Sequence, residues 1–84
     1  MARVRKLYWG HPVSGAHPTE VDAELRSVRL PDGETLLQIS TFGSDRRATH
    51  QKVSQTVQLN RATALKLRDA INELFDANDR NVSR

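Results

Sequence analysis

The chain lacks several residue types that define common protein classes. Its 84 residues include no cysteine, four glycines, three prolines and only 5% aromatic residues. Without cysteine there can be no disulfide, thiol nucleophile or thiolate metal site. No uninterrupted apolar run is longer than Leu7–Trp9, which is too short for a transmembrane helix. The basic start Arg3–Lys6 has no apolar stretch after it, which predicts no signal peptide. We therefore expect a small soluble protein of the cytoplasm.

The charge is small in sum but uneven along the sequence. The formal net charge is +3, from 13 basic and 10 acidic residues. The first 19 residues carry three bases and no acid, whereas residues 20–45 carry six acids against two bases. Residues 46–68 again hold no acid, and their six bases are Arg46, Arg47, Lys52, Arg61, Lys66 and Arg68. An acid-free basic stretch is typical of proteins that bind a polyanion, so the sequence favours a nucleic acid as the partner.

Hydrophobic periodicity predicts a single α+β domain. Alternating residues predict strands over 20–30, 35–42 and 53–59, and a further short strand is expected at 3–9. Pro31–Glu34 predicts a tight hairpin turn in which Asp-Gly supplies the positive φ angles. Asn60 suits the N-cap of a helix over 61–77, whose single apolar stripe is expected to lie across the sheet. The expected fold is a small antiparallel sheet of about four strands followed by one long C-terminal helix.

The same patterns predict boundaries and buried faces. Residues 1–19 are expected to form a short strand and a loop, 20–77 the sheet and helix, and 78–84 a disordered tail. A change of alternation in the first long strand predicts either a bulge near Arg26–Ser27 or partial cover on both sides. The polar composition of residues 43–52 predicts a long loop or the tip of a hairpin. Leu37 and Ile39 are expected to face inward; the outward side chains are Gln38, Ser40, Ser54, Thr56 and Gln58.

Catalytic chemistry finds little support in the sequence. His11, His17 and His50 lack the spacing of a metal site, and the first two, six residues apart, have no third ligand. There is neither a serine nucleophile elbow nor a glycine-rich phosphate loop. The sequence thus predicts no enzyme, no cofactor, no metal and no small-molecule substrate.

Nucleic-acid binding has a clearer physical basis. Mobile basic side chains can contact phosphates, and polar groups on a sheet face can contact the edges of unpaired bases. The candidate binding residues are Arg29, Arg46, Arg47, His50, Lys52, Ser54, Thr56, Gln58 and Arg61. Tyr8, Trp9 and Phe42 are the rings on which bases could stack. Trp9 and Phe42 could equally be core or dimer contacts, and the Ser, Thr and Gln row could be ordinary solvent-facing residues.

A family resemblance rests on three sequence segments, Ser27–Arg29, Asp32–Ser40 and Val57–Asn60. The third is followed by the helical positions Leu67 and Ile71. In this order the chain resembles, over residues 25–77, the positive cofactor four family of single-stranded-DNA-binding transcriptional coactivators. The resemblance implies a curved four-stranded antiparallel sheet and a homodimer paired through its helices. It also implies that single-stranded nucleic acid binds with little sequence preference. The matching contact positions are Arg29, Arg46, Arg47, Lys52 and the strand face Ser54–Gln58.

The chain departs from the family pattern at its rings. The family has aromatic residues at the end of the second hairpin strand, where this chain has only Phe42. It also has an aromatic residue in the first helical turn, where Ala64 and Leu65 stand here.

A small domain buries only about 60% of its unfolded surface, so a second copy would enlarge a thin core. The candidate dimer interface is the helical stripe Leu67, Ile71, Leu74 and Phe75. The alternative function is a module for dimerisation or for binding another protein.

Overall fold

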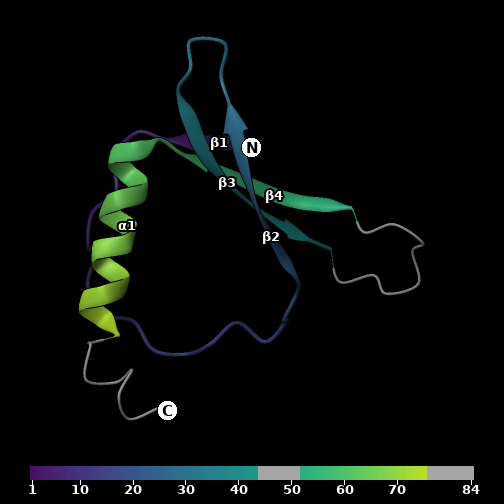
Figure 1. Cartoon of the computed structure of the whole chain (residues 1–84). Helices are drawn as coiled ribbons and strands as arrows, with labels where there is room; N and C mark the ends of the chain where they lie inside the picture. Colours follow the sequence, from purple (N-terminus) through teal and green to yellow (C-terminus); the bar gives the residue numbers. More distant parts are fainter. Residues whose placement is uncertain (44–51, 76–84) are drawn as a thin grey trace, which may run out of the picture.

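The computed structural model describes residues 1–43 and 52–75, which form one sheet and one helix (Figure 1). The elements are β1 (Ala2–Val4), β2 (Ala23–Arg29), β3 (Thr35–Phe42), β4 (Val53–Leu59) and α1 (Arg61–Leu74). The strands lie in the order β1-β4-β3-β2. The predicted α+β fold, a four-stranded sheet followed by a C-terminal helix, is therefore confirmed.

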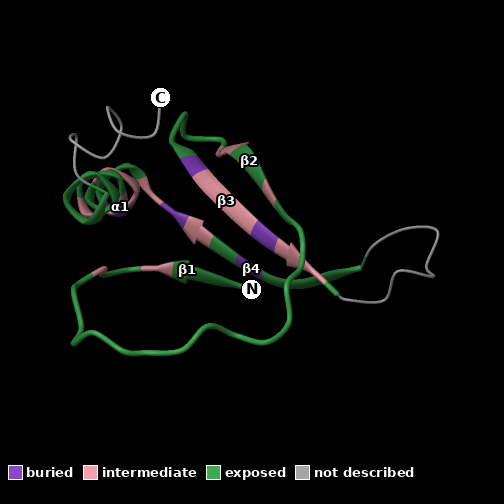
Figure 2. Cartoon of the chain, turned by 90° about the horizontal axis from the view of Figure 1, so that it is seen from below, coloured by how far each residue is buried: buried purple, intermediate pink, exposed green. Residues whose placement is uncertain are grey.

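The first strand differs from its prediction in length and direction. β1 covers three residues instead of 3–9, and it pairs with β4 in parallel, from Ala2↔Val57 to Val4↔Leu59. The β2–β3 and β3–β4 pairs are antiparallel. β1 and β2 therefore point the same way from opposite edges of the sheet, which requires a long connection between them. Residues 5–22 supply that connection, and they pass around the sheet without regular structure (Figures 1 and 2).

A three-residue loop joins β2 and β3 into the predicted hairpin. The Gly33 amide donates to the Leu30 carbonyl at 2.9 Å, and the Leu30 amide donates to the Glu34 carbonyl at 2.8 Å. Gly33 has a φ of +92°, but Asp32 does not have a positive φ, contrary to the prediction. Pro31 explains the difference because its fixed φ suits the first central position of a type I turn. Such a turn needs a left-handed residue only after it. The Asp32 carboxylate accepts the Glu34 amide at 2.8 Å.

The irregularity in the sheet lies in a different place from the one predicted. β2 and β3 pair without interruption from Ala23↔Thr41 to Arg29↔Thr35, so no bulge occurs near Arg26–Ser27. The register shifts instead between β3 and β4, where Thr41 pairs with Gln55 but Phe42 pairs with Val53. Ser54 is the extra residue of this bulge, and it is exposed. The clean alternation predicted for β4 therefore holds only from Gln55 onward.

Because paired residues share a face, the sheet has one polar face and one apolar face. We define the polar face as Arg3, Glu24, Arg26, Gln38, Ser40, Thr56 and Gln58, and the apolar face as Val4, Leu25, Leu37, Ile39, Val57 and Leu59. The register also places Val28 and Leu36 on the polar face, at its end beside the hairpin turn. Among the described residues only two apolar side chains are fully buried, Leu36 at 2% exposure and Leu59 at 4%. Leu37 and Ile39, predicted to face a core, are half-buried. The core is thus confined to the end of the sheet next to the helix (Figure 2).

The helix begins where predicted and runs in an unexpected direction. The Asn60 side chain accepts the Thr63 amide at 2.9 Å and the Thr63 hydroxyl at 2.9 Å, so Asn60 is the predicted N-cap. α1 contacts β3 and β4 near its N-terminal turn and then extends away from the end of the sheet (Figures 1 and 2). It does not lie across the sheet, because Asn60 alone separates it from β4. α1 ends at Leu74, with Phe75 as its C-cap, three residues before the predicted end at 77. Residues 76–84, which include the predicted tail, lie outside the described residues.

Replacing Asn60 tests the cap. Asn60→Ala is expected to lower the free energy of unfolding by about 1 kcal/mol, because the Thr63 amide loses its acceptor, whereas the Thr63 hydroxyl can still donate to the Asn60 backbone carbonyl at 3.2 Å. Denaturant unfolding at unchanged m-value measures this loss. Asn60→Ser keeps an acceptor and serves as the control, with a smaller expected loss. Equal losses in the two variants would show that the side-chain cap does not stabilise the helix.

Candidate nucleic-acid interface

Three of the candidate binding residues, Arg46, Arg47 and His50, lie outside the described residues. The two residues that border their segment are nevertheless well placed. The Gly43 amide donates to the Lys52 carbonyl at 3.0 Å, which continues the pairing of β3 and β4. Both ends of the segment are therefore held together at one end of the sheet, next to the exposed side chains of Lys52 and Ser54.

The remaining candidate cations do not join this cluster. Arg61 follows β4 at its other end, and a strand of seven residues spans about 20 Å at 3.3 Å per residue. Arg29 is the last residue of β2, the edge strand beyond β3. The pairing register places it on the apolar face of the sheet, with Leu25 and Leu37. Both arginines are exposed. The structure thus groups Lys52 and Ser54 and leaves Arg29 and Arg61 apart from them.

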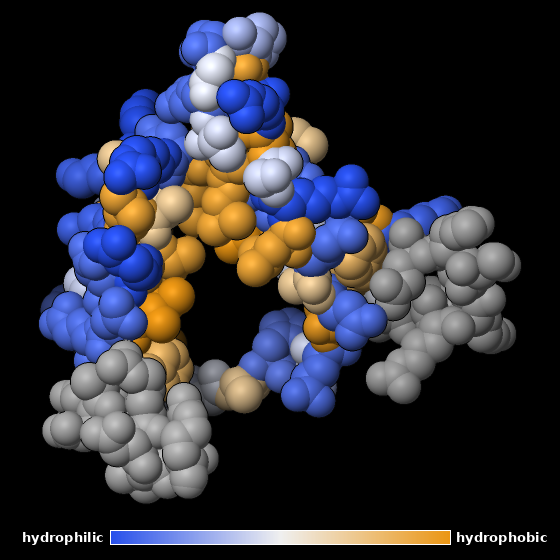
Figure 3. Space-filling model, in the orientation of Figure 1, coloured by the Kyte–Doolittle hydropathy of each residue, from blue (hydrophilic) through white to orange (hydrophobic). Residues whose placement is uncertain are grey.

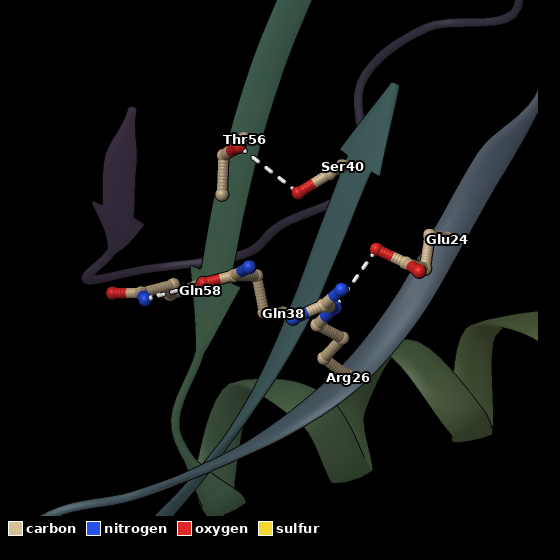
Figure 4. A network of polar contacts seen from close by, with 6 residues as sticks. All are labelled: Glu24, Arg26, Gln38, Ser40, Thr56 and Gln58. Atoms are coloured by element: carbon tan, nitrogen blue, oxygen red, sulfur yellow. Dashed lines mark hydrogen bonds and ion pairs between the residues drawn. The ribbon is translucent and has the colours of Figure 1, made fainter. Parts of the chain in front are cut away.

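The hydroxyl and amide side chains of the central strands bind one another (Figure 4). The Ser40 and Thr56 hydroxyls lie 3.0 Å apart, and these residues are only 4% and 8% exposed. The Gln58 amide nitrogen donates to the Gln38 side-chain oxygen at 2.8 Å. The prediction that this row faces outward is therefore wrong for Ser40 and Thr56. Their short side chains stand on the two central strands, and Glu24, Gln38 and Gln58 are their longer neighbours on the same face.

A row of longer polar side chains crosses all four strands. The register brings Arg3 of β1 beside Gln58, Gln58 beside Gln38, and Gln38 beside Arg26 of β2. The Arg26 Nε also donates to the Glu24 carboxylate at 2.9 Å (Figure 4). The sequence analysis missed Arg3 and Arg26 as members of this surface. Arg26 pairs with Gln38 across the hairpin, so its place on this face could have been predicted from the hairpin register. The place of Arg3 on this face follows from the parallel pairing of β1 with β4, which the sequence does not indicate.

The helix carries a second, chemically different surface. Leu67 is half-buried, but Ile71, Leu74 and Phe75 are 47%, 61% and 61% exposed. The stripe lines one side of a groove of about 210 Å³, whose other side is formed by Leu7–Trp9. Figure 3 shows apolar side chains along the inner side of α1 and on the adjacent sheet, bordering one open region. Three of the four predicted dimer residues, Ile71, Leu74 and Phe75, are thus exposed within the described chain.

Within residues 1–43 and 52–75, no group of three or more histidine, aspartate or glutamate side chains could hold a metal ion. His11 and His17 are exposed, and the His17 Nδ1 accepts the Thr19 amide at 3.1 Å. No helix in this part of the chain has both the length and the apolar character needed to span a membrane. No protein-family model, curated protein or solved structure matches the chain.

Substitution of the buried hydroxyl pair, Ser40 and Thr56, tests whether these residues stabilise the fold. Thr56→Val is expected to lower the free energy of unfolding by about 1–3 kcal/mol, because it leaves the buried Ser40 hydroxyl without a partner. Denaturant unfolding measures the effect. Ser54→Ala, at the exposed bulge, is the matched control with almost no expected change.

The double variant Ser40→Ala with Thr56→Val sharpens the test. Removing both hydroxyls should recover most of the loss, because no unpaired polar group remains. Additive losses in the double variant would show that the two hydroxyls do not depend on each other.

Proposed function

We propose that this chain is a non-enzymatic protein of the cytoplasm that binds single-stranded DNA or RNA. The role that its resemblance suggests is that of a transcription cofactor. The observation that supports the proposal most strongly is that Gly43 and Lys52, the two residues that border the segment 44–51, are hydrogen-bonded at the end of the sheet; the sequence of that segment holds Arg46 and Arg47 against one acid, Asp45. Phosphates attract such a concentration of cations, and the release of their counterions supplies the free energy of binding.

The polar face of the sheet, toward the opposite end of β4 from this segment, suits a flexible strand. This face offers the Gln38 and Gln58 amides between Arg3 and Arg26. Amide groups can donate to and accept from the exposed edges of unpaired bases, while the arginines contact phosphates. A double helix hides these base edges from a flat surface of this kind, so the proposal favours single strands.

A salt series tests the basic segment directly. Replacing Arg46, Arg47 and Lys52 together by Ala should weaken binding to a labelled single-stranded oligonucleotide in fluorescence anisotropy. If all three contact phosphates, the slope of log affinity against log salt should become shallower by about two, at about 0.7 per phosphate. Arg68→Ala is the control, because its side chain already pairs with Asp69 at 2.9 Å. An unchanged slope in the triple variant would remove the segment from the interface, and no binding at low salt would overturn the function.

The uncovered helical stripe supports a second proposal, that the chain is a homodimer. Ile71, Leu74 and Phe75 expose about half or more of their surface beside the open apolar face of the sheet. Isolated exposed apolar residues are common on proteins, but a contiguous set of this size marks an interface. A second copy that presents the same stripe would bury it around a twofold axis.

Sedimentation over a range of concentrations tests the dimer. Ile71→Lys places a charge in the stripe and should raise the dimer dissociation constant by at least about 30-fold, equivalent to about 2 kcal/mol. Glu73→Lys adds a lysine on another side of the same helix and should leave the dissociation constant nearly unchanged. A wild-type protein that stays monomeric at every concentration would instead favour a different protein partner for the stripe.

A further inference from the structure

The segment Arg3–Trp9 combines exposed cations with exposed rings. Arg3, Arg5 and Lys6 are exposed, and within the described residues none of them forms an ion pair with a carboxylate. Tyr8 is 73% exposed and Trp9 is 57% exposed. Two large aromatic side chains in a protein with so small a core would normally be buried in it. Their exposure therefore needs another explanation.

The segment is held in place at two points. Arg3 and Val4 pair with Gln58 and Leu59 of β4 in the parallel ladder. Leu7 is half-buried and lines the groove beside the helix. The rings that follow Leu7 are consequently presented from a fixed backbone, and Arg3 connects the segment to the polar face of the sheet.

The segment places three cations before two aromatic rings, with Leu7 between Lys6 and Tyr8. The Lys6 ammonium lies 5.7 Å from the centre of the Tyr8 ring, close enough for a cation–π contact. Cations beside stacking rings are the combination by which proteins bind unpaired bases and their phosphates together. The same cations oppose a self-contact, because a second copy of the segment would bring like charges together.

We propose that Tyr8 and Trp9 are stacking platforms for the bases of a single-stranded nucleic acid, and that Arg3, Arg5 and Lys6 contact its phosphates. This inference rests on the proposed function and adds a second contact to it, on the opposite edge of the sheet from β2. Stacking requires bases that are free of a partner strand, so the segment discriminates against duplexes.

Trp9 is the only tryptophan, so its intrinsic fluorescence reports on this segment alone. Titration with single-stranded oligo(dT) is expected to quench this fluorescence, whereas the duplex of oligo(dT) with oligo(dA) is not. Trp9→Ala should weaken oligo(dT) binding, measured by anisotropy, by about 5- to 150-fold, the range for loss of one base–aromatic stack. Trp9→Phe keeps a ring and should retain most of the affinity. Val13→Ala is the matched control, because Val13 is exposed and carries no ring.

The outcomes separate this inference from the proposed function. Oligo(dT) binding without quenching, and with an unchanged affinity of Trp9→Ala, overturns the stacking role and leaves the function standing. A blue shift that depends on protein concentration alone, with no response to oligo(dT), also overturns it and assigns Trp9 to the contact between copies. Absence of any oligo(dT) binding in the wild-type protein overturns the function itself. If Trp9→Ala fails to fold by circular dichroism, Tyr8→Ala and Trp9→Phe are compared in its place, and equal affinity in both overturns the stacking role.

Discussion

The single residue between β4 and α1 determines how much of this protein is buried. β4 ends at Leu59 and α1 begins at Arg61, so Asn60 alone sets the direction of the helix. Its extended backbone, with φ −78° and ψ −179°, and its hydrogen bonds to Thr63 fix that direction at the end of the sheet. A helix that turned back over the sheet would need several more linking residues to reverse the chain. Within the described residues, much of the apolar face of the sheet and of the apolar stripe of the helix is therefore left exposed.

This constraint separates two chemistries on a very small scaffold. One surface is polar and basic, and it runs from Arg26 across the amides of Gln38 and Gln58 to Arg3. The other is apolar and consists of the open face of the sheet together with the helical stripe. Leu36 and Leu59 are the buried apolar side chains of residues 1–43 and 52–75, and at roughly 1.5–3 kcal/mol each they supply little stabilisation. Burial of the apolar surface by another molecule would therefore add substantially to the stability of the fold.

The elements governed by local chemistry were predictable from the sequence. The hairpin follows from the turn residues, the helix start from Asn60, and β3 and β4 from their alternation. β3, β4 and the start of α1 lie at their predicted positions, whereas β2 begins three residues later than predicted. The features that depend on partners distant in the sequence were not predictable. The parallel pairing of β1 has no local signal, because only three residues take part. The burial of Thr56 likewise depends on which side chains stand next to it in other strands. The basic candidates Arg29 and Arg61 were recognisable as exposed cations, but their separation from Lys52 follows only from the topology.

The two surfaces meet at the segment that follows β1, and this makes them energetically dependent on each other. Tyr8 and Trp9 line the same groove as Leu67, Ile71 and Leu74, so any molecule that covers the helical stripe also changes the surroundings of the rings. Binding free energies at two sites are linked reciprocally: if occupation of the stripe raises or lowers affinity for a nucleotide strand, the strand changes occupation of the stripe by the same factor. A second copy that braces the rings without covering their faces would reduce the ordering cost of stacking and make the two events cooperative. One that covers the rings would make them compete. The sign of this coupling is therefore set by a few ångströms of placement around Trp9 rather than by the charge of the protein as a whole.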